Sequence, residues 1–274
     1  MIGALLVAAA LAPAVAGSGS AQPRGEAPTL TFSGSTTTLP IVADLAYFYA
    51  RTVPDAPRFA IVGGGTATGI GDTARGIVSA GMVSRELAAT DPSGLVLTPI
   101  ALSGICLITN PANPVSGVTH SQVQDLVTGR ITNWSQVPGS PRTDAVVPVA
   151  LDRVTGARSV FESVFIDAAT QVTYTPRTFL TAAQVRAFVA ATPGAWGYVD
   201  FAFTDRLHVL DYDGVACDRA TIRSGAYPAQ RPLGLVTRGR PRGPVARFLR
   251  WVAASRKARQ VIATRYLIPD RQPS

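Results

Sequence analysis

Three turns in the sequence combine glycine with hydroxyl side chains, at residues 33–38, 63–69 and 153–158. Each follows an apolar run typical of a strand and precedes a pattern typical of a helix. The first backbone N–H groups of such a helix have no partner within it and lie at the positive end of its dipole. One such turn is explained by ordinary helix capping. Three of them predict a shared anion site, since glycine allows close approach and hydroxyls add donors.

The third turn also carries positive charge, because Arg153 and Arg158 flank it. A guanidinium can donate two parallel hydrogen bonds to one oxyanion. The sequence leaves open which of these two arginines contacts the ligand.

Other kinds of chemistry lack their motifs. The glycines at 63, 65 and 69 do not form G-x-G-x-x-G, and the chain has no G-K-[ST] and no G-x-S-x-G. The two histidines, His120 and His208, lie in polar surroundings typical of surface, and with two cysteines they lack the spacing of a zinc site. We therefore expect a binding protein with no catalytic residue, no cofactor and no metal.

The formal net charge is +8 and comes almost entirely from arginine, since Lys257 is the only lysine. A genomic preference for arginine codons explains this, and a positive field that attracts anions is the alternative. The densest cluster has few aromatic residues, which argues against a nucleic-acid partner. It consists of Arg238, Arg240, Arg242, Arg247 and Arg250.

Residues 1–21 predict a signal peptide, because an apolar run at 2–16 is followed by small residues with cleavage sites after 16 or 21. The run is too short for a comfortable membrane span. We expect an exported protein, periplasmic or associated with the cell envelope. Export permits a disulfide between Cys106 and Cys217. Cys106 lies in an apolar run, however, and this favours a buried free thiol.

Strands and helices alternate along the chain and predict a parallel α/β sheet. Two apolar stretches within residues 95–109 are joined by Leu102, Ser103 and Gly104. A helix is expected over 119–128 with Thr119 as its N-cap. No flexible linker is visible, so two lobes would be connected through strands.

Several of these segments together resemble one family, the periplasmic phosphate-binding proteins of ABC transporters, over residues 29–266. The matching segments, in order, are GSTTTLP at 34–40, GGGTATGI at 63–70, GMVSREL at 81–87, TGRITNW at 128–134, TGAR at 155–158 and RPL at 231–233.

The resemblance implies a two-lobed periplasmic-binding-protein fold of type II, in which each lobe is a mixed sheet flanked by helices and hinge strands join the lobes. Lobe 1 is expected at 28–102 plus 205–274, and lobe 2 at 103–204. The implied function is capture of inorganic phosphate by a monomer for an ABC importer, with the membrane permease as partner. The implied ligand-binding residues are Ser35, Thr36, Thr66, Ser79, Ser84, Arg153, Thr155, Gly156, Ala157 and Arg158.

The chain departs from the family pattern at three points. Ser79 stands where the family usually has an aspartate, the turn at 153–158 is about two residues shorter, and a Ser-Gly-Thr becomes Thr155, Gly156 and Ala157. Serine is uncharged yet can still accept a hydrogen bond. Two alternatives therefore stay open: another oxyanion such as sulfate or molybdate, or a secreted scaffold that has lost its ligand.

Overall fold

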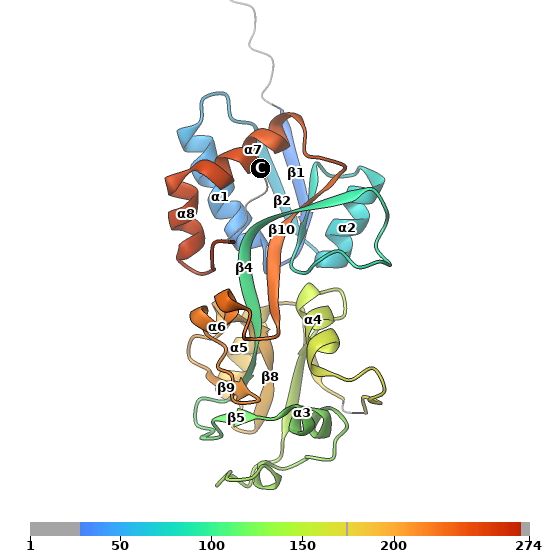
Figure 1. Cartoon of the computed structure of the whole chain (residues 1–274), viewed down its shortest axis with the longest axis vertical. Helices are drawn as coiled ribbons and strands as arrows, with labels where there is room; N and C mark the ends of the chain where they lie inside the picture. The colour runs from blue at the N-terminus through green and yellow to red at the C-terminus, as the bar shows by residue number, and fades with distance from the viewer. Residues whose placement is uncertain (1–27, 174, 270–274) are drawn as a thin grey trace, which may run out of the picture.

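The computed structural model describes residues 28–173 and 175–269, so the expected signal peptide lies outside the described residues. The chain forms two lobes arranged along the long axis of the molecule, joined by two long strands (Figure 1). Each lobe has its own apolar core. Within the described ranges, no helix is long and apolar enough to cross a membrane.

Lobe 1 is built on five strands in the order β2-β1-β3-β10-β4. Strand β1 pairs in parallel with β2 and β3, whereas β10 is antiparallel to β3 and β4. Its strands are β1 (Thr29–Gly34), β2 (Arg58–Gly63), β3 (Ala80–Val83), the first part of β4 (Leu95–Thr109) and most of β10 (Gln230–Arg238). Its helices are α1 (Leu39–Thr52), α2 (Thr66–Arg75), α7 (Gly243–Ala254) and α8 (Arg256–Ala263).

Lobe 2 continues the sheet from the second part of β4 through β8, β6 and β7, while β9 pairs with β4 and β5. Its further strands are β5 (Gly117–Val118), β6 (Val147–Leu151), β7 (Arg177–Phe179), β8 (Ala195–Asp200) and β9 (His208–Tyr212). Its helices are α3 (His120–Val127), α4 (Gly156–Phe165), α5 (Ala182–Ala191) and α6 (Arg219–Ser224), with short 3-10 turns η1 (Trp134–Gln136) and η2 (Phe201–Phe203). The expected N-cap is confirmed, since the Thr119 hydroxyl accepts from the Gln122 amide.

The connection between the lobes consists of β4 and β10, which run antiparallel through both of them (Figure 1). The two apolar stretches expected within residues 95–109 form one continuous strand. Ser103 does not interrupt it, because its backbone pairs with Arg231 on β10 and its side chain is buried. The lobes are thus joined by strands, as the absence of a linker predicted.

The second crossing lies later in the chain than expected. Residues 205–229 were assigned to lobe 1, yet Leu210, Ile222 and Tyr227 belong to the core of lobe 2. Leu233 is the first of the following residues in the core of lobe 1. Strand β9 carries this segment into lobe 2, because it pairs with β4 on the side opposite β8. The chain therefore returns through β10.

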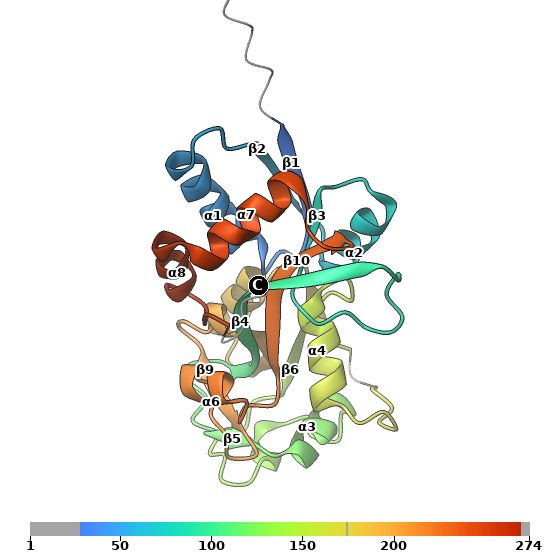
Figure 2. The same ribbon diagram turned by 45° about the horizontal axis from the view of Figure 1, so that its top comes forward.

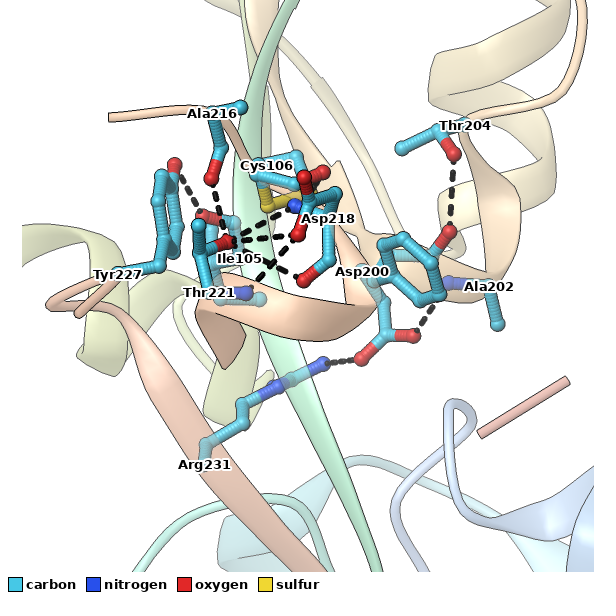
Figure 3. Close-up of a disulfide and its surroundings, with 12 residues drawn as sticks. Ile105, Cys106, Asp200, Ala202, Thr204, Ala216, Asp218, Thr221, Tyr227 and Arg231 are labelled. Carbon is cyan, nitrogen blue, oxygen red and sulfur yellow. Dashed lines mark hydrogen bonds and ion pairs between the residues drawn. A yellow bond between two sulfur atoms is a disulfide. The ribbon is translucent and has the colours of Figure 1, made fainter. Parts of the chain in front are cut away.

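The two cysteines form a disulfide, so the free thiol favoured from the sequence was wrong (Figure 3). Cys106 is on β4, and Cys217 directly precedes the N-cap of α6. Both belong to the core of lobe 2, which shows that an apolar neighbourhood accommodates a disulfide as well as a thiol. The bond ties the segment containing α6 to a hinge strand.

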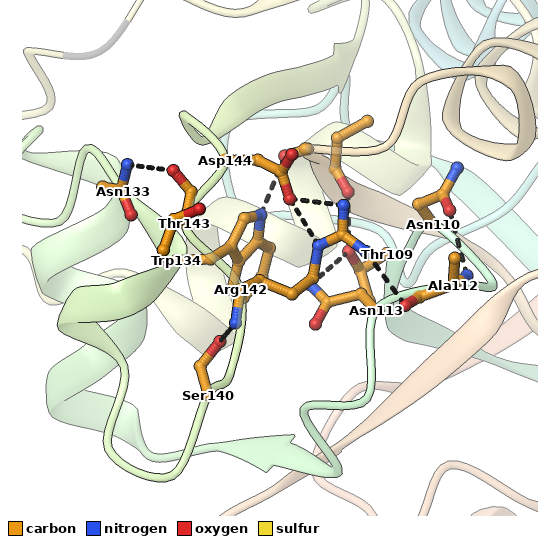
Figure 4. A network of polar contacts seen from close by, with 12 residues as sticks. Thr109, Asn110, Ala112, Asn113, Asn133, Trp134, Ser140, Arg142, Thr143 and Asp144 are labelled. Atoms are coloured by element: carbon orange, nitrogen blue, oxygen red, sulfur yellow. Dashed lines mark hydrogen bonds and ion pairs between the residues drawn. The ribbon is translucent and has the colours of Figure 1, made fainter.

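The TGRITNW segment shapes the part of lobe 2 that lies away from lobe 1, near α3 (Figure 1). Trp134 is fully buried and its indole N–H donates to the Gly194 carbonyl at 3.0 Å. Asn133 caps η1 and donates to the Thr143 carbonyl, and Arg142 pairs with Asp144 nearby (Figure 4). This segment therefore has a packing role in lobe 2.

Candidate anion-binding cleft

Two of the three turns predicted from the sequence, those at 33–38 and 63–69, meet the end of β3 at one edge of the sheet in lobe 1. The Gly34 carbonyl, at the end of β1, accepts from the amides of Gly64 and Gly65 at 2.8 and 2.9 Å. The Ser35 amide donates to the Met82 carbonyl on β3 at 2.8 Å. Because β1, β2 and β3 are parallel, their carboxyl ends lie together, which is where α/β sheets bind ligands.

Buried hydroxyl groups gather at this edge. Ser35, Thr66 and Ser84 are at most 2 % exposed. The hydroxyls of Thr66 and Ser84 lie 3.2 Å apart, and the Ser84 amide donates to the Thr66 hydroxyl, also at 3.2 Å. The Ser35 hydroxyl accepts from the Thr38 amide at 3.2 Å. The three hydroxyls come from the turns that follow β1, β2 and β3.

Lobe 2 touches this edge through the start of α4. A Cβ atom added to Gly156 would lie 2.6 Å from the Ser84 hydroxyl oxygen and 2.7 Å from that of Thr66. The Ala67 amide points to the Val154 carbonyl at 3.5 Å. At Gly65, with a positive φ of 92°, an added Cβ would approach the same carbonyl to 2.5 Å. The turns at residues 66, 84 and 156 thus form one closed contact between the lobes.

The electrostatics of this contact favour an anion. Helix α2 begins at Thr66 and α4 begins at Gly156, so two helix N-termini from different lobes meet here. The N-cap of α2 is Gly65, which has no side chain to satisfy the first amides. Two positive dipole ends repel each other unless a negative group lies between them. This arrangement suits a shared anionic ligand.

The two arginines of the third turn differ in their surroundings. Arg153 is exposed, three residues before Gly156. Arg158 is 7 % exposed, and its Nε donates to Glu162 Oε1 at 2.6 Å. Its backbone amide donates to the hydroxyl of Thr155, the N-cap of α4, at 3.2 Å. Arg158 is thus already engaged within its own helix, while Arg153 stands closer to solvent.

A third arginine reaches the cleft from the hinge strand β10. Arg231, on β10, donates through Nη1 to the Ser84 carbonyl at 2.9 Å and through Nη2 to Asp200 Oδ2 at 2.7 Å. Both charged side chains are at most 1 % exposed, and Figure 3 shows the pair beside β4. Arg231 thus links the hinge strand β10 to both lobes. Asp200, at the end of β8, was missed because no local pattern marks it.

Ser79 lies apart from the other predicted residues. It precedes β3, whereas Ser84 follows it, and the five intervening steps along a strand amount to about 16 Å. Its hydroxyl accepts from the Thr31 amide at 3.1 Å, and its own amide donates to the Thr31 hydroxyl at 3.0 Å. The prediction that Ser79 shares the cleft does not agree with this position. Its hydroxyl instead joins the amino-terminal ends of β1 and β3.

The described residues contain no group of three or more His, Cys, Asp or Glu side chains placed to hold a metal ion. Hydroxyl groups, amides and guanidinium groups are what this cleft offers to a ligand.

Comparison with known proteins places this geometry in a family. The profile of a family described as the PBP superfamily domain matches residues 16–256, most of the chain. The chain belongs to the PBP superfamily. Its mixed α/β fold, with sheets flanked by helices, is that of the type II periplasmic binding proteins.

Individual members of the family give more detail. The phosphate-binding protein PstS of Bacillus subtilis is 26% identical over 249 residues, which cover 88% of this chain and 80% of that protein. A putative phosphate ABC transporter substrate-binding protein from Clostridium perfringens, solved with bound phosphate, has a TM-score of 0.81 and 26% identity, covering 89% of this chain and 100% of the other. An ABC-type phosphate transport receptor from Vibrio cholerae has a TM-score of 0.70 at 24% identity, covering 88% of this chain and 100% of the other; it supports the fold alone.

Proposed function

We propose that this protein binds inorganic phosphate between its lobes and delivers it to the permease of an ABC importer without changing it chemically. The main observation behind this proposal is that the N-termini of α2 and α4 meet beside the buried hydroxyls of Thr66 and Ser84. The relatives from Bacillus subtilis and Clostridium perfringens, named for phosphate binding, support the same ligand.

The proposed ligand groups come from both lobes. Lobe 1 supplies hydroxyls and amides, and lobe 2 supplies the amides at the start of α4. Arg153 provides the charge-assisted hydrogen bonds, because Arg158 is held by Glu162. The full set is Ser35, Thr36, Thr66, Ser84, Arg153, Thr155, Gly156 and Ala157, with Arg158 contributing its positive charge.

Closure of the lobes about β4 and β10 gives the proposed mechanism. An open form admits the hydrated anion, and the closed form replaces its hydration shell with amides and hydroxyls from both sides. The permease then recognises the closed form. We propose that the protein works as an exported monomer, in the periplasm or at the cell envelope.

Titration calorimetry tests the proposal directly. Phosphate should bind, and Ser84→Ala and Arg153→Ala should each weaken binding by about tenfold or more, the size of one or two lost charge-assisted hydrogen bonds. Arg223→Ala is the control, because Arg223 is exposed on α6. Absence of any anion binding by the parent protein would support the alternative of a scaffold without a ligand.

A second oxyanion stays a candidate because the predicted lobe-1 ligands are hydroxyl residues. Hydroxyls can donate to a fully ionised anion or accept from a protonated one. Phosphate and sulfate, titrated at two pH values, separate these cases. A tenfold preference for sulfate would end the phosphate proposal.

A further inference from the structure

The positive charge of the chain is concentrated in one segment. Residues 238–265 contain nine Lys and Arg residues and no Asp or Glu. The other parts of the chain hold the remaining 16 of the 25 basic residues and all 17 acidic ones, so they are close to neutral. A genomic preference for arginine does not explain this distribution, because it would apply along the whole chain.

This segment forms the outside of lobe 1. It comprises the turn after β10 and helices α7 and α8, which pack with α1 in one layer over the sheet (Figures 1 and 2). The apolar sides of the two helices face the core through residues such as Phe248 and Ile262. Five of the nine basic residues in this segment lie on α7 and α8, and all nine are exposed. These are Arg238, Arg240, Arg242, Arg247, Arg250, Arg256, Lys257, Arg259 and Arg265, which we call the basic face.

The basic face is not neutralised by its neighbours. None of its nine side chains forms an ion pair with any residue that the structure describes. The exposed acidic residues on α1 and the turn that follows it are Asp44 and Asp55. An excess of positive charge over several helical turns produces a field that attracts an extended anionic surface.

Aromatic and apolar groups accompany these charges. Tyr47 on α1 is 56 % exposed, with the Arg51 guanidinium 5.3 Å from its ring centroid. The Lys257 ammonium lies 4.1 Å from the ring centroid of Phe48. A groove of about 720 Å³ between β4 and α7 is lined mostly by apolar side chains, with Arg240 and Arg250 among its lining. Basic groups next to partly exposed aromatic and apolar groups are typical of proteins that lie on a lipid surface.

We propose that the basic face docks lobe 1 onto an anionic phospholipid membrane. The charges are spread over two helices and a turn, which fits a flat surface of many mobile headgroups better than a single pocket. Guanidinium groups bind phosphodiester headgroups well. Docking through lobe 1 leaves the cleft between the lobes free, so this inference does not depend on the identity of the anion bound there.

Vesicle pelleting tests the proposal. The purified protein is mixed at low salt with vesicles of phosphatidylcholine, alone or with one third phosphatidylglycerol, in the presence of excess phosphate to fill the cleft. We expect binding to the anionic vesicles only, with strong weakening at high salt. Replacing two charges, Arg247→Gln with Arg250→Gln, should weaken binding by about tenfold or more.

The matched control removes the same net charge from lobe 2, by Arg130→Gln with Arg177→Gln, both at exposed positions near α3 and on β7. It should keep vesicle binding within about twofold, since both charges lie in lobe 2 and not on the basic face, and salt screens what attraction they add. Thermal unfolding checks that both variants fold. Failure of the parent protein to bind anionic vesicles at low salt, or equal loss in both variants, overturns the proposal. In the first case an acidic protein becomes the partner to test.

Discussion

Gly156 is the residue of the cleft with the least room for a side chain. Gly156→Ala should weaken phosphate binding by about tenfold or more, because the new methyl group would lie 2.6 Å from the Ser84 hydroxyl and 2.7 Å from that of Thr66. The methyl group would therefore prevent the two lobes from closing fully. Calorimetry with phosphate provides the measurement.

Gly71→Ala is the matched control for this change. Gly71 lies within α2, and the atoms nearest to an added Cβ are the tips of the Arg75 guanidinium, at 3.8 and 4.0 Å. Alanine should leave affinity unchanged there and raise helix stability slightly. Equal affinity of Gly156→Ala and the parent protein would show that the start of α4 is not part of the binding site.

Arg85, the residue after Ser84, forms an ion pair with the carboxylate of Asp91. Arg85 donates to both oxygens of Asp91, at 2.6 and 2.9 Å, and both side chains are largely buried. The hydrogen bond from Arg85 is the main reason that the pKa of Asp91 is lowered, with the Ala88 amide adding to it against the effect of burial. Asp91 is thus the carboxylate partner of Arg85.

This pair makes stability depend on pH in a defined direction. A carboxyl with a lowered folded pKa stabilises the protein above its unfolded pKa of about 3.9, and this stabilisation is lost as the pH falls through the folded value. Asp91→Asn should therefore cost about 1–2 kcal/mol at neutral pH. The difference from the parent protein should shrink as the pH falls below the unfolded pKa and through the lowered folded one. Denaturant unfolding at several pH values measures it, and a difference independent of pH would contradict this origin.

At the scale of elements, the sequence predicted what depends on neighbouring residues. The Thr119 cap and the strand-to-helix turns follow from short-range preferences, and the structure has them. Ser79 was misplaced because the motif does not show which end of β3 faces the ligand. The return through β10, the disulfide and the Asp200 pairing depend on contacts between distant segments, which no local pattern encodes.

The ion pair between Arg231 and Asp200 joins three elements. Arg231 is on the hinge strand β10, Asp200 ends β8 in lobe 2, and the Ser84 carbonyl follows β3 in lobe 1. Asp200→Asn leaves the Arg231 charge buried and unpaired, which should cost about 3–5 kcal/mol in the free energy of unfolding. Arg231→Met combined with Asp200→Asn should cost less than Asp200→Asn alone, since no unpaired charge remains.

Denaturant unfolding of three variants decides this prediction: Asp200→Asn, Arg231→Met and the two combined. The Nε atom of Arg231 already lacks a partner among the described residues, so the guanidinium has little further compensation once Asp200 is neutral. A double variant as unstable as the sum of the single ones would show that the two side chains act independently.

At the scale of the whole molecule, binding and shape are coupled. The closed contact brings the positive ends of α2 and α4 together, and in the absence of an anion their repulsion favours separation of the lobes. The lobes would separate by bending at the hinge strands, because β4 and β10 run through both lobes. A ligand that bridges the lobes binds the closed form better and shifts the population towards it.

Small-angle X-ray scattering tests this coupling. The radius of gyration of the parent protein should decrease when phosphate is added, because the closed form is the more compact one. Gly156→Ala should keep the larger value at the same phosphate concentration, since its methyl group blocks the contact with Ser84 and Thr66. If the parent protein has the same radius with and without phosphate while calorimetry records binding, then the lobes are closed before the anion arrives and the repulsion between the helix ends is too weak to open them.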